Sequence, residues 1–151
     1  MKKKKKILPI MLVVLLIFGA VLLYVYREYN RAHKDTTDLQ ADFSVNASDL
    51  LKEFETGEAA ANKKYWDKVI RVNGPVKSLS KDERGVYSVA LGDRASMSAV
   101  RCSMDSAHNT EAMKLVNGHE VALKGICTGY NADELLGADI ILVRCVVDKK
   151  K

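Results

Sequence analysis

The stretch VIRVNGPV, Val69 to Val76, decides the fold of this chain. From Ile70 to Asn73, apolar residues alternate with polar ones, which is the period-two pattern of a strand with one buried face. Gly74 and Pro75 then interrupt the alternation, so the pattern predicts one long strand that bends at a β-bulge. A strand bent in this way can take part in both halves of a small barrel.

The rest of the folded region supplies four further strands and two helices. A helix is expected from Asn46, where Asn46 can cap and Leu50, Leu51 and Phe54 share one face. The alternation predicts further strands around 87–91, 99–104, 121–127 and 141–147, and a short helix around 112–116. This order, with a helix between strands three and four, matches a five-stranded OB-fold barrel. An unspecified small sandwich or α+β domain stays open as the alternative.

The N-terminal 26 residues differ in composition from everything after them. Lys2 to Lys6 are five consecutive lysines, and the 20 residues from Ile7 to Tyr26 carry no charge. Such a run reaches about 30 Å as a helix, the thickness of a bilayer's hydrocarbon core, so we expect residues 7–26 to be a transmembrane anchor. A cleaved signal peptide and an apolar helix of a soluble core remain alternatives.

The basic flanks of this run predict its orientation. Five lysines precede it and only Arg27, Arg31 and Lys34 follow closely, which favours a cytoplasmic N-terminus. We therefore expect a single-pass inner (plasma) membrane protein with its folded domain in the periplasm or another extracytoplasmic space. The expected parts are a cytoplasmic basic tail (1–6), the anchor (7–26), a tether (27–45), the OB-fold domain (46–148) and a short tail (149–151).

Several of these segments resemble a known family. NKKYWDK (Asn62–Lys68), VIRVNGPV and NGHEVALKGICTGY (Asn117–Tyr130) are similar to the bacterial OB-fold family described as tRNA-anticodon-binding-like. Many members of that family are small envelope proteins with an N-terminal membrane segment or lipid anchor. The resemblance implies an OB-fold and supplies no catalytic residues, because a fold does not dictate a function.

Three cysteines, Cys102, Cys127 and Cys145, fall on the expected inward faces of three strands. Outside the cytoplasm a disulfide is chemically permitted, and we favour Cys127 with Cys145 over Cys102 with Cys145. Three free buried cysteines are the alternative. No metal-ligand spacing and no Cys-x-x-Cys pair occurs in the sequence, so neither a zinc site nor redox catalysis is expected.

Motifs of catalysis and cofactor binding are absent from the sequence. There is no Walker loop, dinucleotide fingerprint, nucleophile elbow or His-Glu-x-x-His. We therefore expect a protein that is not an enzyme and that uses no cofactor.

Ligands of OB-folds commonly bind on strands two and three, between the loops that flank them. The outward positions expected there offer one cation, Arg101, and no aromatic ring. A basic run beside the first strand and one aromatic residue in the loop between strands four and five complete the candidates. The candidate ligand-binding residues are Lys68, Arg71, Lys77, Arg84, Arg101 and Tyr130.

The expected function is a membrane-anchored, envelope-facing OB-fold binding or interaction module. Its partners would be the lipid bilayer, through residues 7–26, and an envelope protein or anionic envelope polymer. Single-stranded nucleic acid is the alternative ligand, although single-strand binders normally offer stacked aromatic rings and a basic groove.

Overall fold

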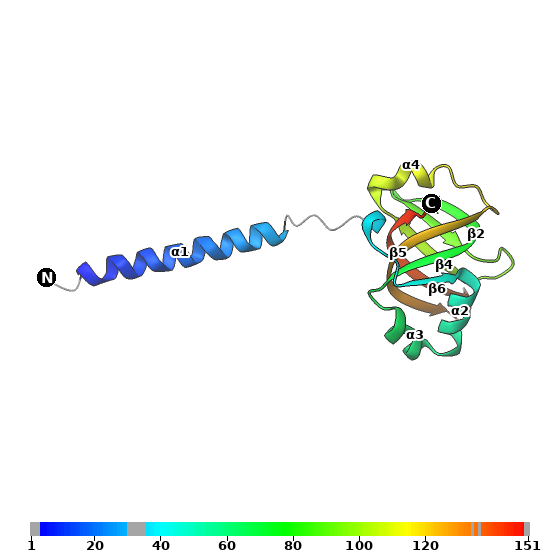
Figure 1. Ribbon diagram of the computed structural model, residues 1–151, viewed down its shortest axis with the longest axis horizontal. Coiled ribbons are helices and arrows are strands. Elements are labelled where there is room, and N and C mark those ends of the chain that lie inside the picture. Colours follow the sequence, from blue (N-terminus) through cyan, green and yellow to red (C-terminus); the bar gives the residue numbers. More distant parts are fainter. Residues whose placement is uncertain (1–3, 30–35, 134, 136, 150–151) are drawn as a thin grey trace. The chain divides into compact units, whose positions relative to one another are not determined.

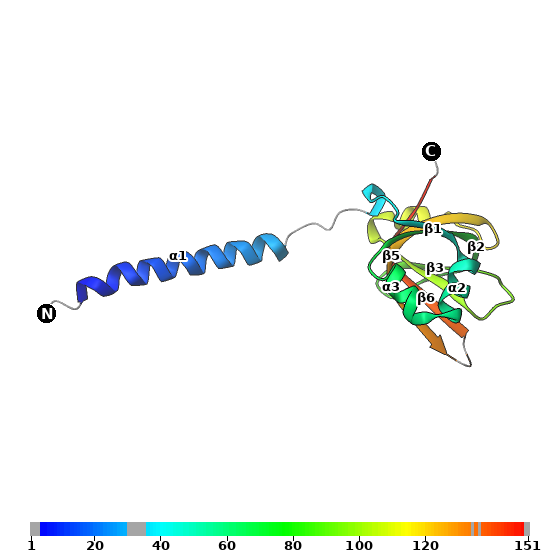
Figure 2. The ribbon, with the colours of Figure 1, turned by 60° about the horizontal axis from the view of Figure 1, so that its bottom comes forward.

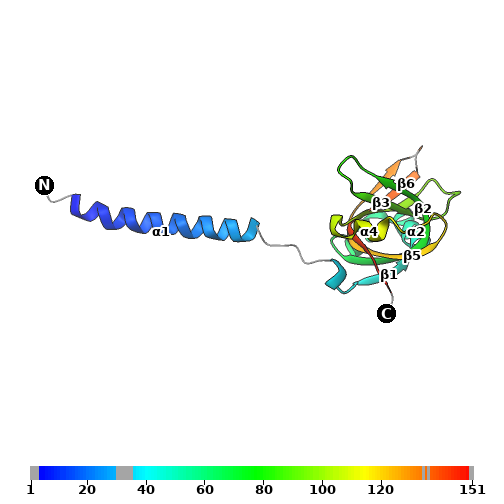
Figure 3. The same ribbon diagram turned by 90° about the horizontal axis from the view of Figure 1, so that it is seen from above.

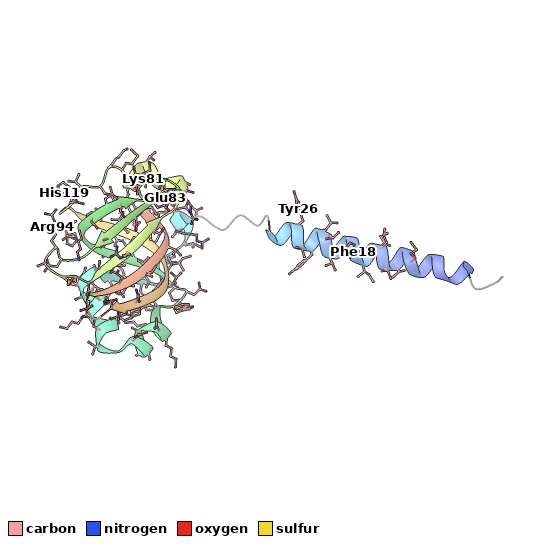
Figure 4. All side chains as sticks on the ribbon, turned by 180° about the vertical axis from the view of Figure 1, so that it is seen from behind. Phe18, Tyr26, Lys81, Glu83, Arg94 and His119 are labelled. Atoms are coloured by element: carbon pink, nitrogen blue, oxygen red, sulfur yellow. The ribbon has the colours of Figure 1, made fainter. Side chains whose placement is uncertain are left out.

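The structure is a computed structural model that describes residues 4–29, 36–133, 135 and 137–149. The chain forms two compact units, divided between residues 34 and 35. In the first unit, residues Lys4–Tyr29 form one α-helix, α1. Figure 4 shows Phe18 and Tyr26 projecting from it.

The expected transmembrane anchor requires correction. Within the described part of the chain, no helix is both long enough and apolar enough to cross a membrane. The prediction of an anchor over residues 7–26 is therefore wrong, as are the single-pass inner membrane location and the periplasmic placement that depended on it.

The second unit is a barrel made of one mixed sheet of six strands. The strand order is β1-β2-β3-β4-β6-β5, and β2 also pairs with β5, which closes the sheet on itself. The five strands from β2 to β6 thus have the neighbours of an OB-fold. Their bounds are β1 (Phe43–Asn46), β2 (Val69–Lys81), β3 (Tyr87–Leu91), β4 (Ala99–Met104), β5 (Glu120–Asp133) and β6 (Gly137–Val147).

The predicted count of five strands is wrong because β1 adds a sixth. It pairs with β2 in parallel, with Phe43 beside Ile70. Asp42 fixes this pairing, because its N–H donates to the Val69 carbonyl and its carboxylate accepts from the Val69 N–H, at 2.8 and 2.9 Å. Only four residues long, β1 shows too little alternation to be recognised in the sequence.

The long strand β2 serves two neighbours, as the bend in its sequence suggested. Its first half pairs with β5, and its second half pairs with β3 after a register shift between Val76 and Ser78. The shift lies just beyond the predicted interruption at Gly74 and Pro75. Gly74 is needed for close packing, since a Cβ there would lie 3.0 Å from the Cβ of Ala47.

Helices cover the two ends of the barrel. Helices α2 (Ala47–Thr56) and α3 (Glu58–Tyr65) lie at one end, and α4 (Asn109–Ala112) lies at the other with the end of β6 (Figures 1 and 2). Seen from above, α4 lies across the barrel opening (Figure 3). The 3-10 turns η1 (Thr36–Asp38) and η2 (Ser106–His108) are also at the α4 end. Asn46 precedes α2 as predicted, but its side chain donates to the Asp49 carboxylate and does not cap the helix.

The inward faces of the strands and the buried face of α2 form a single core. Burial of these apolar side chains is the main favourable contribution to folding. Its largest fully buried side chains include Leu50, Phe54, Tyr65, Ile70, Val72, Val89, Leu91, Val100, Leu123, Ile140 and Leu142.

Candidate binding face

The predicted ligand face lies on the outer surface of β3 and β4, and β6 continues this surface on the other side of β4. On β3 and β4, Ser88 stands opposite Ser103 and Ala90 opposite Arg101. On the other side of β4, Arg101 pairs in parallel register with Ile141 of β6. The neighbouring positions on β3 and β4 point into the core, so these outward residues form one continuous face. We call Ser88, Ala90, Arg101, Ser103 and Ile141 the outer face.

The one cation of the outer face has an acidic partner. Arg101 Nε lies 2.5 Å from a carboxylate oxygen of Asp139, and the side chains of Arg101 and Asp139 are 55% and 22% exposed. This ion pair neutralises the only charge on the face. Beside it, Ile141 remains 38% exposed, a high value for an isoleucine in a sheet.

Two loops border the outer face and both present apolar side chains. Met97 in the β3–β4 loop is 62% exposed and Leu135 in the β5–β6 loop is 82% exposed. The loops are held together, because the Ala138 N–H donates to the Ser98 hydroxyl at 3.0 Å. Gly137 has a φ of +85°, and its backbone lies directly against Met97. A side chain there would be strained and would also push the two loops apart.

The structure does not bring the predicted ligand-binding residues together. Arg71, on β2, forms an ion pair with Asp148, and its Nε lies 2.6 Å from a carboxylate oxygen. Lys77 donates to the Ser96 and Ser98 carbonyls at 2.5 and 3.2 Å, which supports the β3–β4 loop. Lys68 and Arg84 are exposed at separate turns. Arg84 shares the β2–β3 turn with Glu83, which Figure 4 labels beside Lys81. These residues remain predictions and do not form one site.

Tyr130, the predicted aromatic contact, packs against the helices. Its ring stacks on Phe54 with centroids 5.0 Å apart, and Phe54 in turn stacks on Tyr65 at 6.0 Å. Burial raises the pKa of the Tyr130 hydroxyl, and the charges of Glu55 and Glu58 act in the same direction. The ring therefore stabilises the contact between β5 and α2.

The three cysteines are free and buried in this structure. The strand register puts Cys127 opposite Leu142, so Cys127 does not face Cys145 directly. Cys145 is instead close to Cys102. Burial raises the pKa of the Cys145 thiol well above its usual value, and a hydrogen bond and charge interaction with Cys102 add to the effect. Among the described residues, no group of three or more His, Cys, Asp or Glu side chains could hold a metal ion.

Sequence reasoning missed three residues that pair with the outer face or border it. Asp139 was not recognised as the partner of Arg101, because the two residues are 38 positions apart in the sequence. Met97 and Leu135 were not among the candidate residues chosen from the sequence. Large apolar residues inside polar loops were the signal that could have identified them.

Comparison with known proteins agrees with this architecture. A family model described as tRNA_anti-like matches residues 1–147. The chain belongs to the tRNA_anti-like family. The family predicted from the sequence motifs is thereby confirmed. No curated protein matches the sequence.

Among solved structures, this tRNA_anti-like chain is similar to a proposed nucleic acid-binding lipoprotein from Klebsiella pneumoniae, at a TM-score of 0.54 and 19% identity. The match covers 79% of this chain and 100% of the other. OBody AM3L09, solved bound to hen egg-white lysozyme, gives a TM-score of 0.43 at 20% identity over 58% of this chain and 88% of the other. Asparaginyl-tRNA synthetase from Pyrococcus horikoshii gives a TM-score of 0.38 at 18% identity, over 58% of this chain and 21% of the other. At 19% identity, the match to the Klebsiella protein supports the fold alone.

Proposed function

We propose that this chain is a non-catalytic binding module that binds a segment of a partner protein on its outer face. The observation that carries the proposal is the chemistry of that face. Ser88 and Ser103 carry small hydroxyl side chains, Ala90 is only 6% exposed, Ile141 is 38% exposed, and the single charge is neutralised by Asp139. Such a surface suits close packing against another protein surface.

The two bordering loops support the same proposal. Met97 and Leu135 expose apolar side chains on the two loops at the Gly137 end of β6, the strand that also carries Ile141, and exposed apolar groups gathered at one place mark interaction surfaces more often than scattered ones do. Methionine adapts its shape to different partners, which suits a site at the rim of an interface.

Single-stranded nucleic acid is the second candidate. The description of the Klebsiella relative as nucleic acid-binding favours it. The outer face argues against it, because binders of this kind stack bases on aromatic rings at about 1–3 kcal/mol per base and line the groove with cations. On the five residues that define the outer face, there is no ring and no unpaired cation.

The two candidates differ in a cross-linking experiment. A photoreactive amino acid replaces Ile141 in one variant of the full-length chain and Glu83, in the β2–β3 turn, in a matched control. Irradiation in cells that produce the protein is expected to attach a protein partner at position 141 and not at position 83. Cross-links to nucleic acid alone at position 141, or equal protein cross-linking at both positions, would contradict the proposal.

A binding measurement tests the second candidate separately. We expect a fluorescent oligothymidine to show no change in anisotropy with up to about 100 μM protein at low salt, the condition that most favours phosphate contacts. A salt-dependent affinity tighter than that would support nucleic acid in place of a protein partner.

A further inference from the structure

A polar groove of about 640 Å³ lies outside the outer face, at the α4 end of the barrel. It is built where the first residues of the barrel unit, the helix α4 and the end of β6 come together (Figures 1 and 2). Its polar lining residues are Thr37, Arg71, His108, Glu111, Lys124, Asp148 and Lys149.

Two cations face each other across neighbouring strands in this groove. Arg71 of β2 is the register partner of Lys124 of β5. Like charges directly opposite one another destabilise a sheet, so this arrangement requires compensation. Lys124 is only 8% exposed, and its ammonium donates to the carbonyls of Thr37 and Leu39 at 3.0 and 2.8 Å. Within the described chain no carboxylate pairs with Lys124, so its positive charge remains unneutralised.

Arg71 is compensated by a side chain near the end of the chain. Its Nε lies 2.6 Å from an oxygen of Asp148. The N–H is not aligned with that oxygen, however, and Nε has no hydrogen-bond partner among the described residues. The contact is therefore an ion pair that leaves a buried donor unsatisfied. Unsatisfied donors of this kind are uncommon in folded proteins.

The remaining wall adds another cation and an imidazole. Lys149 pairs with Glu111 at 2.7 Å, and this hydrogen bond lowers the pKa of the Glu111 carboxyl, with the charges of Lys149, His108 and Lys114 contributing. His108 Nε2 lies 3.3 Å from the Thr37 hydroxyl. The groove thus holds three cationic side chains against two carboxylates, and its excess charge is positive.

We propose that this groove is a binding site for a phosphate group, either free or as a phosphate ester. Arg71 and Lys149 would contact the oxyanion, and Lys124 would contribute its buried charge. Without phosphate, the Asp148 carboxylate is the counter-ion of Arg71. When phosphate binds, it takes the place of this carboxylate beside the guanidinium. Arginine is suited to this exchange, because its planar guanidinium binds carboxylates and phosphates through the same fork of donors.

The test measures binding of inorganic phosphate to the full-length chain by ³¹P NMR line broadening at constant ionic strength. Asp148→Asn removes the competing carboxylate and is expected to tighten binding by about threefold to fivefold. Arg71→Gln is expected to weaken binding by about tenfold or more. Lys63→Gln is the matched control, because it removes the same charge from an exposed position on α3, and it should change the affinity less than twofold.

Two results would overturn the proposal. One is an Asp148→Asn variant that binds no more tightly than the parent chain, and the other is a Lys63→Gln variant that loses as much affinity as Arg71→Gln. Should Arg71→Gln fail to fold, Lys149→Gln, which changes an exposed side chain, is used in its place.

Two further probes distinguish the source of the phosphate. Glycerol 3-phosphate represents small esters, and an oligothymidine with and without a 5′-phosphate represents nucleic acid ends. Binding of the ester that responds to Asp148→Asn supports a small-molecule ligand. Binding of the oligothymidine only when phosphorylated, with the same response, supports a nucleic acid end. Equal binding of both oligonucleotides without sensitivity to Arg71→Gln contradicts the site. Because these readouts do not involve the outer face, they are independent of the proposed protein partner.

Discussion

Replacement of Gly125 by alanine should test how tightly the barrel is packed around Cys145. Gly125 lies on β5, and a Cβ added there would overlap the Sγ of Cys145 and lie 3.2 Å from the Val143 carbonyl oxygen. Cys145 is fully buried and cannot move into open space. Overpacking of a closed core costs about 1–3 kcal/mol, and the severity of this overlap favours the upper part of that range. For a domain of this size, the loss corresponds to a fall in Tm of about 8–12 °C.

A double-mutant cycle separates this overlap from a general effect of the substitution. Cys145→Ala alone should cost about 1–2 kcal/mol, because it leaves a small cavity. When both changes are combined, the new methyl group occupies that cavity, so the double variant should be within about 1 kcal/mol of Cys145→Ala. Gly129→Ala, on the same strand, is the matched control, since a Cβ there meets no atom within 4 Å. It should change stability by less than about 1 kcal/mol.

The assay is urea unfolding of the full-length chain followed by the fluorescence of Trp66, the single tryptophan of the sequence. Additive effects of Gly125→Ala and Cys145→Ala in the double variant would refute the reasoning. A loss for Gly129→Ala equal to that for Gly125→Ala would refute it as well.

Three further predictions follow from individual contacts. Lys124→Met should leave the carbonyls of Thr37 and Leu39 without their donor and cost about 1–3 kcal/mol, with faster amide hydrogen exchange over residues 36–42 as the local readout. The raised pKa of the Cys145 thiol means that the unfolded state ionises first, so the contribution of this thiol to stability should be constant below about pH 9 and fall above it. Cys145→Ala should reduce that fall in pH-dependent urea midpoints. Asp139→Asn should cost less than about 1 kcal/mol in thermal unfolding, because Arg101 is 55% exposed and solvent screens the pair.

Local patterns were sufficient for the strands with one buried face. The alternation around β3 and β4 has a strict period of two, and the structure pairs Val89 with Cys102 inside the barrel. The long strand and its bend could be recognised because Gly74 and Pro75 interrupt a clear alternation. Such features depend on residues close together in the sequence.

Features created by distant residues were missed or misread. β1 forms because Phe43 pairs with Ile70 across a parallel register that no local pattern records. The sequence pattern around Lys124 predicts an exposed polar position on a strand. In the structure η1 covers this side chain, which is only 8% exposed. The membrane prediction depended on composition alone, and the described part of α1 does not support it. For the candidate site, the sequence identified Arg101 but not the Asp139 carboxylate that removes its charge.

The contacts at the α4 end also determine how the barrel would respond to tension. At the start of the barrel, Lys124 donates a hydrogen bond to the Thr37 carbonyl, and at its end Arg71 forms an ion pair with Asp148. Lys124 and Arg71 lie on β5 and β2, which are hydrogen-bonded to each other. A force applied between residues 36 and 149 would therefore load these side-chain contacts first, together with the Lys149–Glu111 pair and the hydrogen bond from the Asp148 N–H to the Ala122 carbonyl. We expect the strand ladders and the outer face to stay intact until these contacts are broken.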